Sequence, residues 1–128
     1  MTTTMTAADS DAARATECAR LNDLCRAGNL KQSRTVFTRG CIDAFCDSSD
    51  RLSLFAVQAA LMDKVRGHVF AGGDDPHCER DFGAFEYEGE RLFWKIDYYD
   101  PTLTFGSEDP TDLAKTQRVL TIMLANDY

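Results

Sequence analysis

Residues 81–100, DFGAFEYEGERLFWKIDYYD, constrain the fold more than any other segment of the chain. These twenty residues contain three Phe, one Trp, three Tyr and six carboxylates. Aromatic residues favour strands, and the Glu88-Gly89 pair favours a tight turn in the middle of the segment. The segment therefore predicts an aromatic β-hairpin with an acidic surface.

A two-residue turn at Glu88 and Gly89 determines how the two strands pair. Gly83 then lies opposite Trp94, where the missing side chain leaves room for the indole. The face expected to join the core carries Phe85, Tyr87, Leu92, Trp94, Ile96 and Tyr98. The other face is mixed and carries Phe82, Glu86, Arg91, Phe93, Lys95 and Asp97. A loop longer or shorter by one residue would shift the register and exchange the two faces.

Length and composition indicate one soluble domain. The chain has 128 residues, of which 44% are hydrophobic and 27% charged, and no segment approaches the roughly 20 apolar residues of a membrane span. We expect a polar, mobile tail over residues 1–10 and a single domain over 11–128. Five cysteines, an odd number, and the lack of a signal-peptide pattern argue against a disulfide framework and predict a cytoplasmic protein. We expect no cofactor.

Two helices are predicted before the hairpin. Residues 11–27 place Cys18, Leu21 and Cys25 on one helical face, and residues 52–65 repeat apolar side chains at a similar spacing. Residues 34–39 predict a strand, which 41–46 would continue beyond a bend at Gly40. Residues 47–50 predict a loop that caps the second helix, and residues 71–80 an exposed loop.

The C-terminal segment has two interpretations. Asp109-Pro110 is typical of a helix start, and we favour a helix over residues 113–125. The β-branched Val119, Thr121 and Ile122 instead favour a buried strand after one helical turn. Either way we expect an α+β fold, with two to three helices packed on a small antiparallel sheet centred on the hairpin.

The acidic residues are concentrated in one segment. Residues 71–112 contain twelve Asp and Glu against three Lys and Arg, whereas the rest of the chain has nine acids and eleven bases. Such a surface repels nucleic acid and attracts basic partners, although a solvated face that maintains solubility has the same composition. The run of Arg and Lys between Arg14 and Arg39 is too modest to predict direct nucleic-acid binding.

Motifs for catalysis are sparse. Glu79, Asp81, Asp97 and Asp100 lie at the open end of the predicted hairpin, where converging carboxylates would bind Mg²⁺ or Ca²⁺ or form an acid/base pair. Surface carboxylates paired with bases give the same pattern. His77, next to Cys78, is interpreted as a solvated loop side chain, and the cysteine spacings do not match a zinc site.

Four phrases carry a family resemblance: LNDLCR, RTVFTRG, DDPHCERDFGAFEYEGERLFWKIDYYD and GSEDPTDLAKTQRVLTIMLANDY. Over residues 21–128 the chain resembles the bacterial family called "domain of unknown function 3768". The family pattern before the hairpin is N-D-P-x-G-E-H-D-F-G, so Asp74, Cys78 and Arg80 stand where the family has Asn, Gly and His. The resemblance implies no established activity, and any role of that His is absent here. Members resemble accessory genes of plasmids and other mobile elements, often near antirestriction genes.

The leading functional hypothesis is a non-enzymatic binding protein that meets a basic protein partner. It would be an anti-defence inhibitor, either anti-CRISPR or antirestriction, that acts as a charge mimic on a nucleic-acid-binding surface. The expected contact residues are Glu79, Glu86, Glu88, Glu90, Asp97, Tyr98, Tyr99 and Asp100. The alternatives are a small metal-dependent hydrolase or nuclease that uses Asp81, Asp97 and Asp100, and a homodimeric accessory protein of a mobile element.

Overall fold

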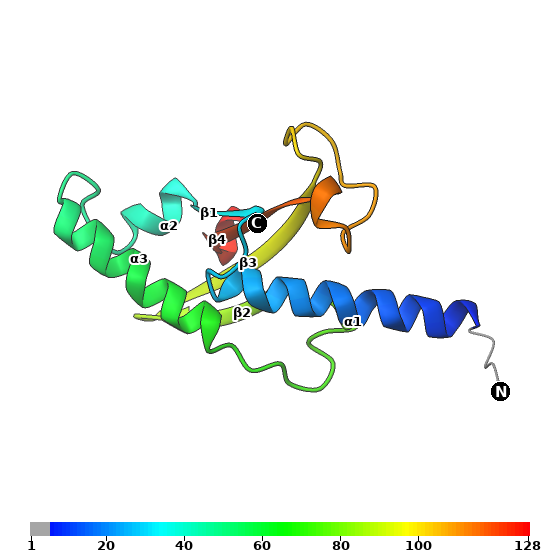
Figure 1. The fold of residues 1–128 in the computed structure, drawn as a ribbon. Coiled ribbons are helices and arrows are strands. Elements are labelled where there is room, and N and C mark those ends of the chain that lie inside the picture. The colour runs from blue at the N-terminus through cyan, green and yellow to red at the C-terminus, as the bar shows by residue number, and fades with distance from the viewer. Residues whose placement is uncertain (1–5) are drawn as a thin grey trace.

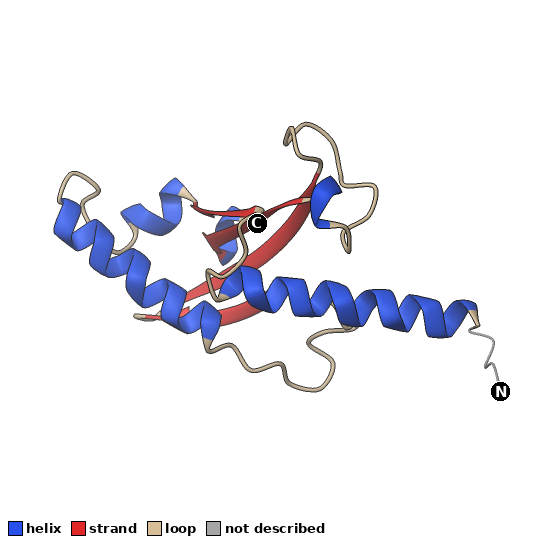
Figure 2. Cartoon of the chain, in the orientation of Figure 1, coloured by secondary structure: helices blue, strands red, loops and turns tan. Residues whose placement is uncertain are grey.

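A computed structural model describes residues 6–128 (Figures 1 and 2). These residues form one four-stranded sheet, three α-helices and two short 3-10 helices. The α-helices are α1 (Ala7–Arg26), α2 (Arg39–Asp43) and α3 (Arg51–Arg66). The strands are β1 (Ser33–Phe37), β2 (Phe82–Tyr87), β3 (Glu90–Tyr99) and β4 (Gln117–Leu124), and the 3-10 helices are η1 (Leu113–Lys115) and η2 (Ala125–Asp127).

The sheet is mixed, with the strand order β1-β4-β3-β2. β2 pairs antiparallel with β3 and β3 with β4, but β1 runs parallel to β4. The α+β class is therefore confirmed, and the sheet expected to be antiparallel is so except for the parallel pairing of β1 with β4. The chain between β1 and β4 contains two helices and the hairpin, and a connection of that length lets the two strands run in the same direction.

The helices cover one face of the sheet. In Figure 1, α1 and α3 lie across the same side of the strands, and both contribute to one core. The largest core side chain is Trp94, which is 0% exposed. The fully buried or nearly buried members are Leu21, Cys25, Leu30, Cys41, Leu61, Val65, Leu92, Trp94, Ile96, Leu120 and Ile122. The alternate strand residues point to the opposite face, which α1 and α3 leave uncovered and where Tyr128 packs against Phe82 and Phe93 with ring centroids 6.0 and 5.7 Å apart.

The hairpin has the predicted register. β2 and β3 join at Glu88 and Gly89, and Gly83 pairs with Trp94 as expected. Leu92, Trp94 and Ile96 are buried on the helix-covered face, so the predicted core face is confirmed. Because Gly83 has no side chain, the Trp94 indole lies directly across it.

The helix expected over residues 113–125 is wrong. One 3-10 turn, capped by the Asp112 side chain at the Ala114 amide, leads into β4, as the alternative interpretation required. β4 is a central strand that pairs with both β1 and β3. The β-branched Val119 and Thr121 suit that position, and the pairing on both sides outweighs the local helical signal.

Two other boundaries differ from the expectations. α1 begins at Ala7, inside the expected tail, because Thr6 and Asp9 form a capping box; the rest of that tail, residues 1–5, lies outside the described residues. Residues 41–46 do not extend β1, since Thr38 caps the short helix α2 there. Asp50 caps α3 as predicted, and accepts hydrogen bonds from the amides of the next turn.

Candidate functional site

Three glutamates surround the turn between β2 and β3. Glu86, Glu88 and Glu90 are all exposed, and within residues 6–128 none of them forms an ion pair. The structure therefore places these three predicted contact residues around one turn, with Glu86 and Glu90 on opposite faces of the hairpin and Glu88 at its tip. We refer to this set as the acidic turn.

The backbone of the turn has a defined conformation. Glu88 has φ 47° and Gly89 has φ 81°, which are the two positive φ values of a type I′ turn. This turn matches the right-handed twist of the paired strands. Behind it, the Tyr87 ring packs edge-on against Phe45, with ring centroids 4.9 Å apart. The acidic turn is thus anchored to the chain between α2 and α3.

Three other predicted contact residues lie at the opposite end of β3. Asp97 pairs with Lys95 at 2.8 Å on the uncovered face of the sheet, and alternation places Tyr99 on that face too. Asp100 accepts hydrogen bonds from the Thr104 amide and the Thr102 hydroxyl, which lower the pKa of its carboxyl group. Because β3 has ten residues, this group is about 30 Å from the acidic turn.

The last two predicted residues, Glu79 and Tyr98, belong to a buried polar cluster. Tyr98 donates a hydrogen bond from its hydroxyl to the Glu79 carboxylate at 3.2 Å. The Asn22 amide nitrogen donates to the Glu79 carbonyl at 2.9 Å and to the Tyr98 hydroxyl at 2.8 Å. Both side chains are half-buried and hydrogen-bonded within the fold, and neither joins the acidic turn.

Arg118 lies at the centre of this cluster and is 0% exposed. Its Nε donates to Asn22 Oδ1 at 2.7 Å, and one terminal nitrogen donates to the Pro110 carbonyl at 2.7 Å. Its guanidinium also lies over the Tyr98 ring, 5.0 Å from the centroid. Among residues 6–128 it has no carboxylate ion-pair partner, so neutral acceptors alone hold a buried cation.

The cluster contains no activated nucleophile. Cys18, which lies 3.5 Å from an Arg118 nitrogen, lines a cleft of about 330 Å³ with His77 and Glu79. Burial raises the pKa of the Cys18 thiol and also that of the Tyr98 phenol. No hydrogen bond joins Cys18 to His77 in the described part of the chain. Both groups therefore stay protonated at neutral pH, and the cluster links α1 to the sheet.

The carboxylates of the alternative metal site do not converge. Asp97 lies on the uncovered face, whereas alternation puts Asp81 on the side of Gly83 and the helices. Asp100 is engaged in its own loop. Across residues 6–128, no three His, Cys, Asp or Glu side chains are grouped as metal ligands. The geometry therefore gives no support to a metal-dependent hydrolase.

Replacing Asp81 by asparagine is expected to raise the melting temperature at pH 7 and to leave it unchanged at pH 3. Burial, and then the nearby Glu79 charge, raise the pKa of the Asp81 carboxyl group above its ordinary value of 3.8. The ionised group thus opposes folding at pH 7, and this effect disappears once the carboxyl group is protonated in both states. Thermal unfolding at both pH values tests this. A Mg²⁺-dependent rise in melting temperature that D81N abolishes would contradict it.

Arg80, which the resemblance places where the family has histidine, makes contacts within the fold. Its backbone adopts φ 57°, and its N–H donates to the Asp75 carboxylate. Its Nε lies 3.1 Å from an oxygen of Asp23 in α1, and its guanidinium lies 4.7 Å from the Phe70 ring centroid. Arg80 therefore connects the loop before β2 to α1.

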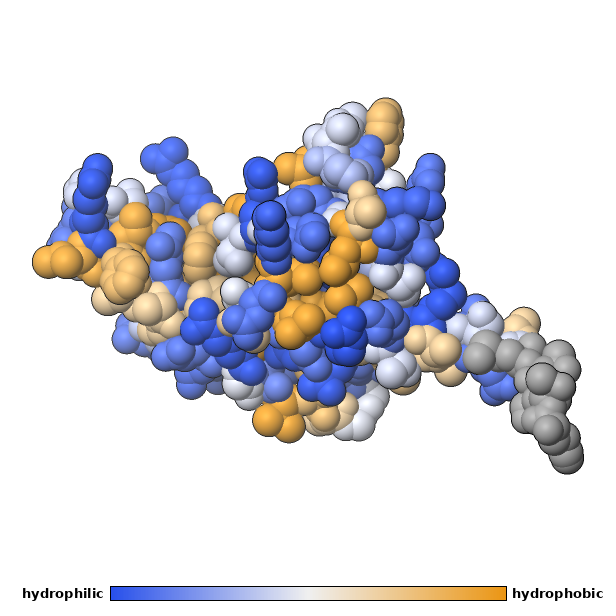
Figure 3. Space-filling model, in the orientation of Figure 1, coloured by the Kyte–Doolittle hydropathy of each residue, from blue (hydrophilic) through white to orange (hydrophobic). Residues whose placement is uncertain are grey.

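Apolar side chains are also exposed at the surface. Leu52 and Phe55, at the start of α3, are 84% and 73% exposed, and hydrophobic surface gathers at that end of the helix in Figure 3. Most of the face seen in Figure 3 is hydrophilic. None of the helices in the described chain is both long and apolar enough to span a membrane.

Sequence reasoning missed Asn22 and Arg118. Each has a polar side chain in a segment that otherwise supplies the core, LNDLCR for one and RVLTIML for the other. A polar residue at a core position is a signal for a buried hydrogen-bond network. That signal was available for Arg118, because strand alternation puts it on the same face as Leu120 and Ile122.

The fold and these sites define a small α+β protein with a buried arginine cluster and an exposed acidic turn. The chain belongs to the family described as "protein of unknown function (DUF3768)", whose model matches residues 46–127. The match confirms the resemblance, over a shorter range than 21–128. No curated protein and no solved structure matches the chain significantly. Two phrases of the resemblance meet within the matched range, because Glu79 and Tyr98 of one share the buried cluster with Arg118 of the other.

Proposed function

We propose that this protein is a non-enzymatic binding protein whose acidic turn contacts a basic surface of a protein partner in the cytoplasm. The partner class is a nucleic-acid-binding protein, and the effect is inhibition by charge mimicry. An anti-defence inhibitor that acts on a restriction or CRISPR complex fits this description. Charge complementarity of this kind steers association and selects partners.

The proposal rests on the exposure of three glutamates and on their lack of ion-pair partners among residues 6–128. Glu86, Glu88 and Glu90 lie within five residues, are exposed, and lack ion-pair partners among residues 6–128. Three carboxylates around one turn produce a local negative potential, and a basic partner surface complements it. Of the other acids of the hairpin segment, Asp97 pairs with Lys95, Asp100 caps its own loop, and Asp81 is half-buried on the side of the helices.

The proposed contact set is smaller than composition suggested. Glu79 and Tyr98 are engaged in the buried cluster, so they contribute to stability and not to contact. Asp97, Tyr99 and Asp100 would form a second contact only with a partner that spans about 30 Å. The proposal therefore rests on the acidic turn, and the homodimer alternative is an outcome of the experiments below.

Reversing two charges of the turn is expected to weaken partner binding by about tenfold or more. The double variant E88K/E90K replaces two attractive contacts by repulsive ones, and about 1.4 kcal/mol corresponds to each factor of ten. The measurement is capture of restriction and CRISPR effector complexes on immobilised protein at rising salt. Wild type should retain a partner at low salt and release it as screening increases.

The matched control is the double variant D11K/E108K. It changes the net charge by the same amount, but Asp11 lies near the N-terminal end of α1, and Glu108 follows the end of β3 opposite to the turn. We expect it to bind like wild type. Equal loss in both double variants would show that only net charge matters, and the absence of any salt-sensitive partner would reject the proposal.

A further inference from the structure

β2 is an edge strand with an unused row of backbone hydrogen-bonding groups. It pairs with β3 on one side only. The Ile96 amide donates to the Asp81 carbonyl at 2.8 Å, and antiparallel pairing repeats this bonding at every second residue. The N–H and C=O groups of Phe82, Ala84 and Glu86 therefore point away from the sheet. Within residues 6–128 no hydrogen bond outside the sheet uses them.

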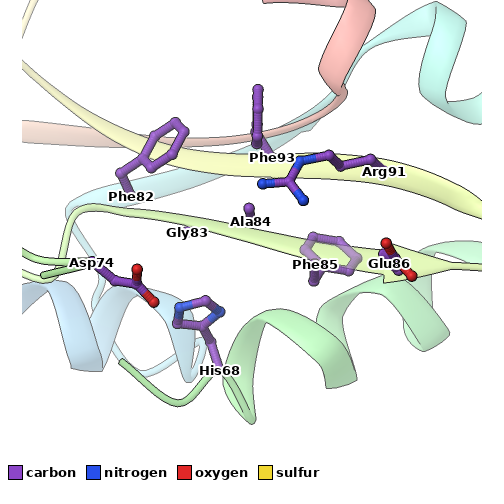
Figure 4. A pocket seen from close by; sticks show the side chains of 9 residues that line it. All are labelled: His68, Asp74, Phe82, Gly83, Ala84, Phe85, Glu86, Arg91 and Phe93. Atoms are coloured by element: carbon purple, nitrogen blue, oxygen red, sulfur yellow. The ribbon is translucent and has the colours of Figure 1, made fainter. Parts of the chain in front are cut away.

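A groove follows this edge. Figure 4 shows β2 running between two walls, with Phe82, Ala84 and the Arg91 side chain on one side and His68 and Asp74 on the other. The volume of the groove is about 540 Å³. Ala84 is the smallest side chain on its wall, and it leaves a notch between larger neighbours. The walls therefore leave space for side chains of an added strand on both faces of the sheet.

The charges of the groove are mainly acidic. Asp74 and Glu86 lie near its two ends, and Arg91 is the only cation among its lining residues. Burial, and then the charge of Arg26, lower the pKa of His68, which leaves its imidazole neutral at pH 7. Beyond Glu86 the groove opens onto the acidic turn. Its electrostatic complement is an extended segment that carries lysine or arginine.

A second copy of this chain is a poorer occupant. Antiparallel pairing of two β2 strands about Ala84 would bring two Arg91 side chains together, because each extends toward its own Ala84 (Figure 4). Each copy also has a net charge of −7. Like charges at the centre and over the whole surface oppose self-pairing. A basic segment of a different protein meets neither obstacle.

We propose that the free edge of β2 takes up an extended, basic segment of the partner protein as a fifth strand of the sheet. This inference rests on the proposed function and adds the mode of binding. Backbone hydrogen bonds at Phe82, Ala84 and Glu86 provide the affinity, and Asp74, Glu86 and the acidic turn select a basic sequence. Strand addition also satisfies an edge that is otherwise open to aggregation.

The test uses a fluorescein-labelled nonapeptide in which lysine alternates with valine. We expect wild-type protein to bind it, as measured by fluorescence anisotropy, and the variant A84P to bind at least about tenfold more weakly. Proline lacks the outward N–H, while the ladder to β3 does not use that group. The control A84S keeps the N–H and should bind like wild type. Circular dichroism verifies the fold of both variants.

A second experiment uses modified peptides with wild-type protein, so it does not require the proline variant to fold. Methylating the peptide nitrogens at alternate positions gives two probes, and only the one that blocks the amides facing β2 should lose binding. The inference is overturned if the nonapeptide does not bind, if both methylated probes bind equally, or if a dimer that A84P abolishes is found instead. If the immobilised protein captures a partner and E88K/E90K weakens that capture, but the nonapeptide does not bind, this inference is rejected and the proposed function is left intact.

Discussion

Replacing Asn22 by leucine is expected to lower the free energy of unfolding by about 4 kcal/mol. The Asn22 amide provides an acceptor to Arg118 at 2.7 Å and two donors, to the Glu79 carbonyl and to the Tyr98 hydroxyl. Leucine has a similar size but none of these groups. It would leave the fully buried Arg118 cation without its Nε partner, and unsatisfied buried charges are among the most destabilising changes known in proteins.

Two companion variants make this measurement specific. The substitution N22D keeps an acceptor for Arg118 but removes both donors, so its loss of stability should lie between those of wild type and N22L. N29A alters an exposed asparagine just beyond the same helix and should change stability by less than about 0.5 kcal/mol. Urea unfolding of the four proteins provides the values. A loss below about 1 kcal/mol for N22L would contradict the role given to the cluster.

Replacing Gly83 by alanine is expected to lower the free energy of unfolding by about 3 kcal/mol. An added Cβ atom would lie 2.6 Å from Cε2 of Trp94 and 2.7 Å from Cε1 of His68. Real Cβ atoms do not approach other atoms so closely, and Trp94 is fully buried, so its ring has no free space to enter. The substitution therefore forces the indole or the strand to move.

A double-mutant cycle separates this clash from a general effect on the strand. In a W94L background the indole is absent, and the additional cost of G83A should fall well below about 3 kcal/mol, with the remainder due to the contact with His68 Cε1. G72A is the matched glycine control, because nothing lies within 4 Å of its added Cβ. A cost of G83A that is equal in both backgrounds would contradict the packing of Trp94 across Gly83.

The hairpin register followed from the sequence because its determinants are local. The Glu88-Gly89 turn and the alternation of aromatic residues act within twenty residues, and Gly83 opposite Trp94 made only one register sterically sensible. Local turn geometry and side-chain alternation are sufficient to define such a pair of strands.

β4 and the parallel pairing of β1 depend on partners far away in the chain. The residues of β4 are compatible with a helix or with a buried strand. They form a strand because β4 lies between β1 and β3 and pairs with both. Val36 of β1 pairs with Thr121 of β4, a contact that no local pattern indicates. Non-local pairing can override local preference, which is why the C-terminal helix was an incorrect prediction.

The candidate site was predictable only in part. The charges of Glu86, Glu88 and Glu90 could be grouped because a turn joins them. Glu79 and Tyr98 were counted as surface contacts, although the core-face position of Tyr98 already indicated burial. Asn22 was beyond sequence reasoning, because its partners are brought to it by the loop before β2 and by β3.

The proposed charge mimicry requires that the acidic turn competes with nucleic acid for a basic surface. The most direct measurement uses a partner captured by the immobilised protein and a labelled nucleic acid that it binds. Fluorescence anisotropy then follows displacement of the nucleic acid by wild type, E88K/E90K and D11K/E108K. We predict full displacement by wild type and by D11K/E108K, and displacement that requires about tenfold more of E88K/E90K. A ternary complex that retains the nucleic acid, or equal displacement by all three proteins, would contradict the claim.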